Sequence, residues 1–211
     1  RYSLDIYHKN QKIPLQSKPC EILVNHPAIV RVDHYLIKVR DIEAKKIQPF
    51  FSKDHITIPS KTETEYFKKF VTNIVRQYEV NAEGFKINKI NTERNAFITL
   101  SQSINNLVFI VLSFSYKHKR IMANSPQKVF VDFHQKSGDI SYDKYERDET
   151  FEITFHNLLN DMGLISYDQV NYEIKNNRSK AFDQQLYEMV EWINSNEKDL
   201  LKAGLTLEQK A

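Results

Sequence analysis

Three side chains stand at a spacing that suggests metal-dependent nuclease chemistry. Asp33, Glu43 and Lys45 fit the loose pattern D-x9-E-x-K, in which two carboxylates hold a magnesium ion and a lysine steadies the attacking water. A chain with 27 acidic residues and 30 lysines and arginines shows such a pattern by chance. Glu43 and Lys45 also fall in an expected loop. We therefore keep a metal-dependent nuclease only as a minor alternative.

The histidines offer no recognisable metal site. None of them forms the H-E-x-x-H spacing that places two ligands on one face of a helix. We expect His118 and His134 to meet across neighbouring strands, but the sequence supplies no third ligand for a metal between them. We therefore predict structural or surface roles and no bound metal. The seven are His8, His26, His34, His55, His118, His134 and His156.

The most pointed basic feature is the run Tyr116-Lys-His-Lys-Arg120, which is followed by Lys128 at the start of the next expected strand. Clustered cations beside an aromatic ring can bind phosphates and stack on bases. The alternative is a solvated turn that keeps a hairpin soluble. We take Lys117, Lys119, Arg120 and Lys128 as the candidate nucleic-acid-binding residues.

Glycine and cysteine are too scarce for several classes of site. The four glycines stand alone, whereas Walker A, Rossmann and kinase loops need several of them close together to wrap a phosphate chain. We therefore expect no catalytic residues in this chain, no ATP binding by it, and no cofactor.

The single cysteine, Cys20, allows no internal disulfide and favours a reducing, cytoplasmic location. The longest apolar run, Leu107 to Leu112, is far too short to cross a membrane.

Charge is unevenly distributed along the chain. Residues 1–130 hold 21 lysines and arginines against 11 acids, whereas residues 131–211 hold 9 against 16. The basic part can attract a polyanion, or the acidic part can dock against it. The sequence does not choose between these, and it leaves the oligomeric state open. Because the chain begins at Arg1, we expect it to be an excised piece of a longer protein.

The order of elements predicts an α+β fold, in which mostly antiparallel strands pack with three to four helices concentrated at the C-terminal end. We divide the chain into a β-rich segment 1–60, a helix with an antiparallel meander over 61–146, and a helical segment 147–211, which together can form one domain. In the first segment, the expected strands include 29–39 and 55–58. In the middle segment, strands are expected at 85–90, 96–102, 107–116, 128–134 and 139–142.

Four helices can be placed from their caps and apolar stripes. The first has a capping box at Thr62 and Glu65 and a stripe that includes Phe70, which we expect to pack on a sheet. The second runs from about Asp148 to Met162. Ser179 is expected to cap a third helix, and Ser195 to start a shorter fourth one.

Seven stretches of the sequence carry a family resemblance: Ile47-Gln-Pro-Phe50, Ile56-Thr-Ile-Pro59, Tyr66 to Val71, Val80 to Phe85, Tyr116 to Arg120, Lys128 to Phe133 and Asn157 to Gly163. They resemble the region before the motor in a group of bacterial Snf-type DEAD/DEAH-box helicases. The resemblance implies a full-length protein that binds ATP and magnesium, hydrolyses ATP and translocates on duplex DNA with two RecA-like lobes downstream. None of the ATPase motifs occurs here, so no active-site residue of the family can be carried over.

We therefore expect a non-catalytic accessory region of a helicase-like ATPase, whose partners are DNA, bound weakly and without sequence preference, and the downstream motor. The first alternative is a scaffold that binds only protein. The second is the nuclease built on Asp33, Glu43 and Lys45.

Overall fold

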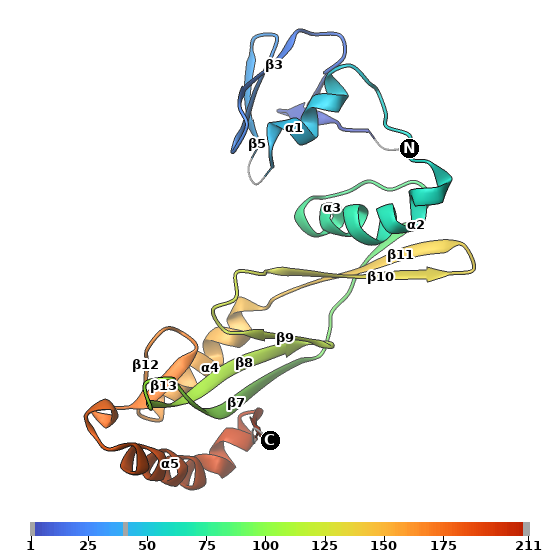
Figure 1. Cartoon of the computed structure of the whole chain (residues 1–211). Helices are drawn as coiled ribbons and strands as arrows, with labels where there is room; N and C mark the ends of the chain where they lie inside the picture. Colours follow the sequence, from blue (N-terminus) through green and yellow to red (C-terminus); the bar gives the residue numbers. More distant parts are fainter. Residues whose placement is uncertain (1–2, 40–41, 209–211) are drawn as a thin grey trace. The chain divides into compact units, whose positions relative to one another are not determined.

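The computed structural model describes residues 3–39 and 42–208. The chain forms two compact units, an N-terminal unit up to Phe70 and a C-terminal unit from Val71. Figure 1 shows the strands and helices of each. The α+β class predicted from the sequence is confirmed, and the longest helix lies near the C-terminal end as expected.

The N-terminal unit is built from two small antiparallel sheets. One is the hairpin of β1 (Ile6–His8) and β2 (Gln11–Ile13). The other joins β3 (Cys20–Val24), β4 (Ala28–Val32) and β5 (Tyr35–Val39) in that order. Short helical turns follow, namely α1 (Ala44–Ile47) and the 3-10 turns Gln48–Phe51 and Ser60–Thr62. The small core of this unit includes Leu15, Val30, Val32, Ile47 and Phe50.

Two predictions for this unit are corrected. The expected strand from Ile29 to Val39 is divided into β4 and β5 by a turn at Asp33 and His34, where Asp33 has a φ of 55°. Aspartate tolerates this left-handed conformation, so the turn needs no glycine. The expected strand from His55 to Ile58 is reduced to an isolated bridge at Ile56.

The expected helix after Thr62 is irregular. It passes through α2 (Glu63–Glu65), a π-helical stretch (Tyr66–Val71) and α3 (Thr72–Gln77). The Thr62 side chain donates to the carbonyl of Pro59 instead of capping the helix, at 3.0 Å. Val71 and Val75 are buried, and α3 packs on β10 and β11. Phe70, a member of the expected stripe, is 39% exposed, so its site is not fully buried.

The C-terminal unit contains two sheets where the sequence predicted one meander. The larger sheet has the order β12-β13-β8-β7-β14, with β9 also on β8. The smaller sheet has the order β10-β11-β6, in which β6 runs parallel to β11. The strands are β6 (Lys86–Lys89), β7 (Arg94–Gln102), β8 (Val108–Tyr116), β9 (Lys119–Met122), β10 (Val129–Lys136), β11 (Asp139–Glu146), β12 (Leu164–Ser166), β13 (Asn171–Ile174) and β14 (Leu205–Glu208).

Two helices cover the larger sheet. Helix α4 (Glu149–Asp161) begins at the predicted place, where the Asp148 carboxylate accepts from the backbone N–H of Phe151 at 2.9 Å. Helix α5 (Phe182–Lys202) is continuous, so the predicted break at Ser195 is wrong. Ser179 lies in the 3-10 turn Asn177–Ser179 and does not cap α5.

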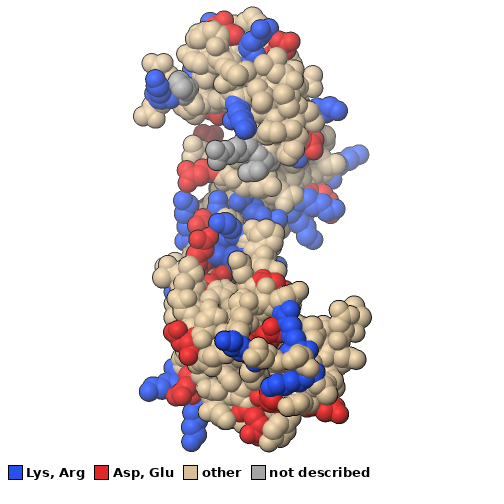
Figure 2. Space-filling view, turned by 90° about the vertical axis from the view of Figure 1, so that its left-hand side faces the viewer, with Lys and Arg blue, Asp and Glu red and all other residues tan. Residues whose placement is uncertain are grey.

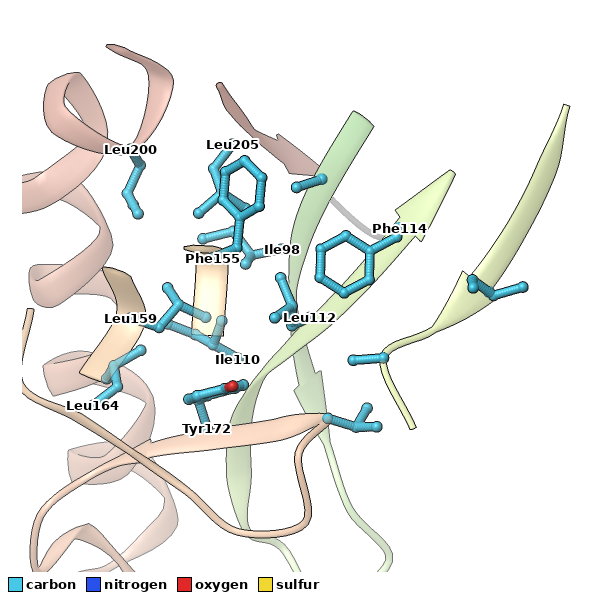
Figure 3. Close-up of a cluster of buried hydrophobic side chains, with 14 of the residues drawn as sticks. Ile98, Ile110, Leu112, Phe114, Phe155, Leu159, Leu164, Tyr172, Leu200 and Leu205 are labelled. Carbon is cyan, nitrogen blue, oxygen red and sulfur yellow. The ribbon is translucent and has the colours of Figure 1, made fainter. Parts of the chain in front are cut away.

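The core of the C-terminal unit lies between these helices and the larger sheet. Figure 3 shows Phe155, Leu159 and Leu200 from the helices turned toward Ile98, Ile110 and Leu112 from the strands. Residues 147–208 therefore share one hydrophobic core with the strands before them.

Candidate nucleic-acid interface

Lys117 lies in the turn between β8 and β9 with a φ of 56°. Its ammonium nitrogen is 3.2 Å from Asp132 Oδ2 and 3.3 Å from Asp143 Oδ2. These two aspartates are directly opposite each other on β10 and β11. Like charges at such positions destabilise a sheet, so the lysine between them supplies the compensating charge.

Two histidines extend this group, which we call the lysine-centred network: Lys117, His118, Asp132, His134 and Asp143. His118 Nε2 is 3.3 Å from Asp132 Oδ1, and His134 Nε2 is 3.0 Å from Asp143 Oδ2. The two histidines thus enter the same network, each through its own aspartate. No group of three or more histidine, cysteine or acidic side chains in the described residues is arranged to hold a metal ion.

The charges of the network stabilise one another. Partial burial lowers the pKa of Lys117, but its hydrogen bonds to Asp132 and Asp143 outweigh this effect and raise that pKa overall. The pKa of Asp143 is lowered, chiefly by the hydrogen bond from Asn88 and then by Lys117 and His134. Lys117 is therefore held by two carboxylates of its own chain and is poorly placed to bind an external phosphate.

Arg120 is also held within the chain. It forms an ion pair with Glu208, and its Nη2 donates to Ser113 Oγ at 2.8 Å. Its guanidinium carbon lies 4.2 Å from the centre of the Phe97 ring, within the range of a cation–π contact. Lys119, by contrast, is exposed on β9 and has no side-chain partner in the part of the chain that the structure describes.

Lys128 lies beside the start of helix α4. Its ammonium nitrogen is 2.8 Å from Glu149 Oε1, and this hydrogen bond lowers the pKa of Glu149. Both side chains are mostly exposed, at 74% and 68%. Exposed ion pairs of this kind are weak, so Lys128 can leave Glu149 for a phosphate at little cost.

Lys128 lines an open groove of about 870 Å³ in the C-terminal unit. The groove runs along the link between β6 and β7, the end of β11 and the start of α4. Its basic lining residues are Lys89, Arg94, Lys128, Lys144 and Arg147, and its acidic ones are Glu146, Asp148 and Glu149. We call it the basic groove.

The parallel pairing of β6 with β11 concentrates charge in the basic groove. Lys89 is directly opposite Lys144 in the register of these strands. The Lys144 ammonium donates to the carbonyl of Tyr78 at 3.3 Å. The Lys89 ammonium nitrogen lies 3.5 Å from Glu79 Oε1, and the Glu79 side chain is 92% exposed. Neighbouring like charges repel, and an anion between the two lysines relieves that repulsion.

The other two basic residues of the groove are committed to the fold. Arg94 forms an ion pair with Asp148, and its guanidinium carbon lies 5.5 Å from the centre of the Phe151 ring. Arg147 forms a buried ion pair with Glu152. The acids Asp148 and Glu149 are in turn favourable at the start of α4, where the helix dipole attracts negative charge. Within the described residues, the other three basic residues, Lys89, Lys128 and Lys144, are held only by Glu79, by Glu149 and by the Tyr78 carbonyl, and we take these three as the ligand-binding candidates of the groove.

Figure 2 shows basic and acidic side chains interspersed on one face of the C-terminal unit. Of the four predicted residues, Lys128 lies in the basic groove, Lys119 is exposed elsewhere, and Lys117 and Arg120 are held by carboxylates. Sequence reasoning missed Lys89 and Lys144, which are far apart in the chain and carry no local motif.

The residues proposed for a nuclease do not come together. Asp33 directly follows the last residue of β4. Ala44, which stands between Glu43 and Lys45, lies near the other end of that strand, where its backbone N–H donates to the carbonyl of Asn25 at 2.9 Å. The five residues of β4 separate the two sites by roughly 16 Å at the rise of a β-strand. One magnesium ion cannot bridge that distance, so the nuclease hypothesis is wrong.

No family model, curated protein or solved structure matches the chain. Among the helices of residues 3–39 and 42–208, none combines the length and the apolar character needed to cross a membrane.

Proposed function

We propose that this chain is a non-catalytic accessory region of a cytoplasmic, helicase-like ATPase, and that it contacts DNA weakly through the basic groove. The single observation that carries the DNA contact is the register of β6 and β11, which places Lys89 beside Lys144 in a groove that also contains Lys128. These lysines present point charges without a pattern of donors for base edges. Binding to phosphates alone is independent of sequence.

The helicase-like context rests on the sequence resemblance described above. In the intact protein, ATP and magnesium belong to the motor, and the accessory region holds DNA near it or positions it. The glycines of this chain are isolated from one another, which supports the assignment of nucleotide chemistry to another part of the protein.

One observation favours a protein-binding scaffold as the second candidate. Lys117, Arg120 and Arg147 are each held by carboxylates of the same chain. A surface whose charges are already paired attracts a polyanion less strongly. DNA affinity therefore decides between the two candidates.

The test is the affinity of the full chain for a fluorescently labelled duplex at low salt, measured by anisotropy. We expect measurable binding at low salt. As the salt concentration rises to the physiological value, the dissociation constant should rise to about 10⁻⁴ to 10⁻⁶ M, as is typical of non-specific contacts. The triple variant Lys89→Gln, Lys128→Gln and Lys144→Gln should bind more weakly than the wild type.

The matched control changes the same number of charges elsewhere in the C-terminal unit. Lys175, Lys198 and Lys202 are exposed and lie outside the basic groove. Replacing these three with glutamine should leave more of the affinity intact than the groove variant does. Equal losses in the two variants would show diffuse attraction, and no binding by the wild type would favour the protein scaffold.

A further inference from the structure

A second concave site lies wholly within the N-terminal unit. It is a pocket of about 180 Å³ between β2, the loop after it and the turn that joins β4 to β5. Pockets for drug-sized ligands have roughly 300–1,000 Å³, so this one suits a small chemical group. Ile13 and Val32, which are 6% and 0% exposed, form its apolar base.

The rim of the pocket is rich in hydrogen-bond donors. Gln11, Lys12, Lys18 and His34 line it, and Asp33 is its single acidic lining residue. Amide, ammonium and protonated imidazole groups all donate to oxygen. The chemistry of the rim therefore favours an anion that accepts several hydrogen bonds at once.

Asp33 holds two of these donors in place. Lys18 Nζ lies 3.0 Å and His34 Nδ1 3.1 Å from Asp33 Oδ2. The backbone N–H of Asp33 donates to the carbonyl of Pro19 at 2.9 Å, which fixes the turn. The Lys18 ammonium, followed by His34, lowers the pKa of Asp33, so this carboxylate stays ionised. The imidazole faces Asp33 with Nδ1, and its Nε2 edge can donate to an anion when the ring is protonated.

Lys12 supplies a donor that is free to move. Its ammonium nitrogen is 2.7 Å from Asp5 Oδ1, and the two side chains are 57% and 40% exposed. Exposed pairs of this kind contribute little to stability. An anion in the pocket can therefore attract Lys12 away from Asp5, and Lys18 and His34 line the same pocket beside Asp33.

We propose that this pocket binds a phosphate group, through Lys12, Lys18 and His34 with the amide of Gln11. A phosphate offers several acceptor oxygens in a small volume, and lysines bind it as point charges. The pocket belongs to a different unit from the basic groove, so the proposal does not depend on the proposed DNA contact there. The phosphate is either a free monoester or a diester of a nucleic-acid backbone.

The test is a titration of the full chain with inorganic phosphate at constant ionic strength, followed by the backbone amide signals in NMR. We expect saturable shifts confined to residues 11–13, 18 and 33–35. The double variant Lys12→Gln and Lys18→Gln should raise the dissociation constant roughly tenfold or more, because it removes two charge-assisted contacts. The matched control, Lys38→Gln with Lys53→Gln, changes two exposed lysines of the same unit that do not line the pocket and should bind like the wild type.

The two sources of phosphate are then separated with thymidine monophosphate and the dinucleotide TpT. Tighter binding of the monophosphate identifies a monoester site, and equal binding identifies a site for backbone phosphate. Shifts that do not saturate, or that are lost equally in the control variant, would overturn the proposal. If the double variant loses its dispersed amide spectrum, the single variant Lys12→Gln decides, since both Lys12 and its partner Asp5 are exposed.

Discussion

Arg147 and Glu152 form a buried ion pair where strand β11 meets helix α4, and their side chains are only 9% and 6% exposed. Arg147 Nε donates to Glu152 Oε1 at 2.8 Å, and Arg147 Nη2 donates to the carbonyl of Ala123 at 2.8 Å. The Tyr116 hydroxyl donates to the same Glu152 oxygen at 2.5 Å. The pair therefore links the end of β8, the segment after β9 and the end of β11 to the first turn of α4. Arg147 lines the basic groove, but its guanidinium is already committed to these contacts.

Replacing Glu152 with alanine should lower the free energy of unfolding by about 3–5 kcal/mol, because it leaves the Arg147 guanidinium buried without a counter-charge. Glu149 on the same turn provides the control, since its pair with Lys128 is exposed and Glu149→Ala should change stability little. Urea unfolding of both variants measures the difference. Similar values for the two would contradict the role assigned to the buried pair.

The lowered pKa of Asp143 predicts how stability depends on pH. A carboxylate whose folded pKa lies below its ordinary value of 3.8 contributes its full stabilisation above that value and loses it as the pH falls through the folded pKa. The difference in unfolding free energy between the wild type and Asp143→Asn should therefore be constant above about pH 5 and shrink at lower pH. Unfolding curves at several pH values test this, and a difference that grows on acidification would refute it.

Two phenylalanines should respond very differently to truncation. Phe130 is 2% exposed, in the core of the C-terminal unit, and Phe130→Ala should cost about 3–5 kcal/mol, as expected for a buried phenylalanine. Phe70 is 39% exposed and stacks on Tyr66 with ring centres 4.8 Å apart, so Phe70→Ala should cost clearly less. Denaturant unfolding gives both values. An equal or larger loss for Phe70 would mean that it is buried after all.

The residues first singled out for DNA binding should contribute little to it. In the triple variant Lys117→Ala, Lys119→Ala and Arg120→Ala, two of the lost cations are already held by Asp132, Asp143 and Glu208. We therefore expect the slope of the logarithm of duplex affinity against the logarithm of salt to change by about one phosphate contact at most. That contact is the one that Lys119 makes. The melting temperature should fall, because Asp132 and Asp143 lose the lysine between them. A slope that changes by three contacts, with an unchanged melting temperature, would show that Lys117, Lys119 and Arg120 all bind DNA, as the sequence predicts.

The parts of the fold that depend on local pattern were predictable. Helix α4 starts at its aspartate cap, and strands β7 and β8 lie where apolar residues cluster. The turn at Asp33 was missed because its residues interrupt an apolar run without glycine, asparagine or proline. This turn contradicts the nuclease hypothesis, because it places Asp33 at one end of β4 while Ala44 lies near the other end.

The candidate site was less predictable because it depends on pairing across long stretches of sequence. Lys89 and Lys144 become neighbours through a parallel strand pair, and parallel pairs are joined by long connections that leave no local signal. The partners of Lys117 and Arg120 are equally remote, since Arg120 reaches Glu208 on the last strand. A basic run in the sequence does not show whether its charges are already neutralised in the fold.

The salt dependence of duplex binding tests the central proposal most directly. If the basic groove binds phosphates, the logarithm of the wild-type affinity falls linearly with the logarithm of salt concentration, with a slope of about −0.9 per phosphate contact. The variant Lys89→Gln, Lys128→Gln and Lys144→Gln should show a slope shallower by about 3, whereas the control Lys175→Gln, Lys198→Gln and Lys202→Gln should keep the wild-type slope. Identical slopes for the wild type and the groove variant would contradict DNA binding in the basic groove.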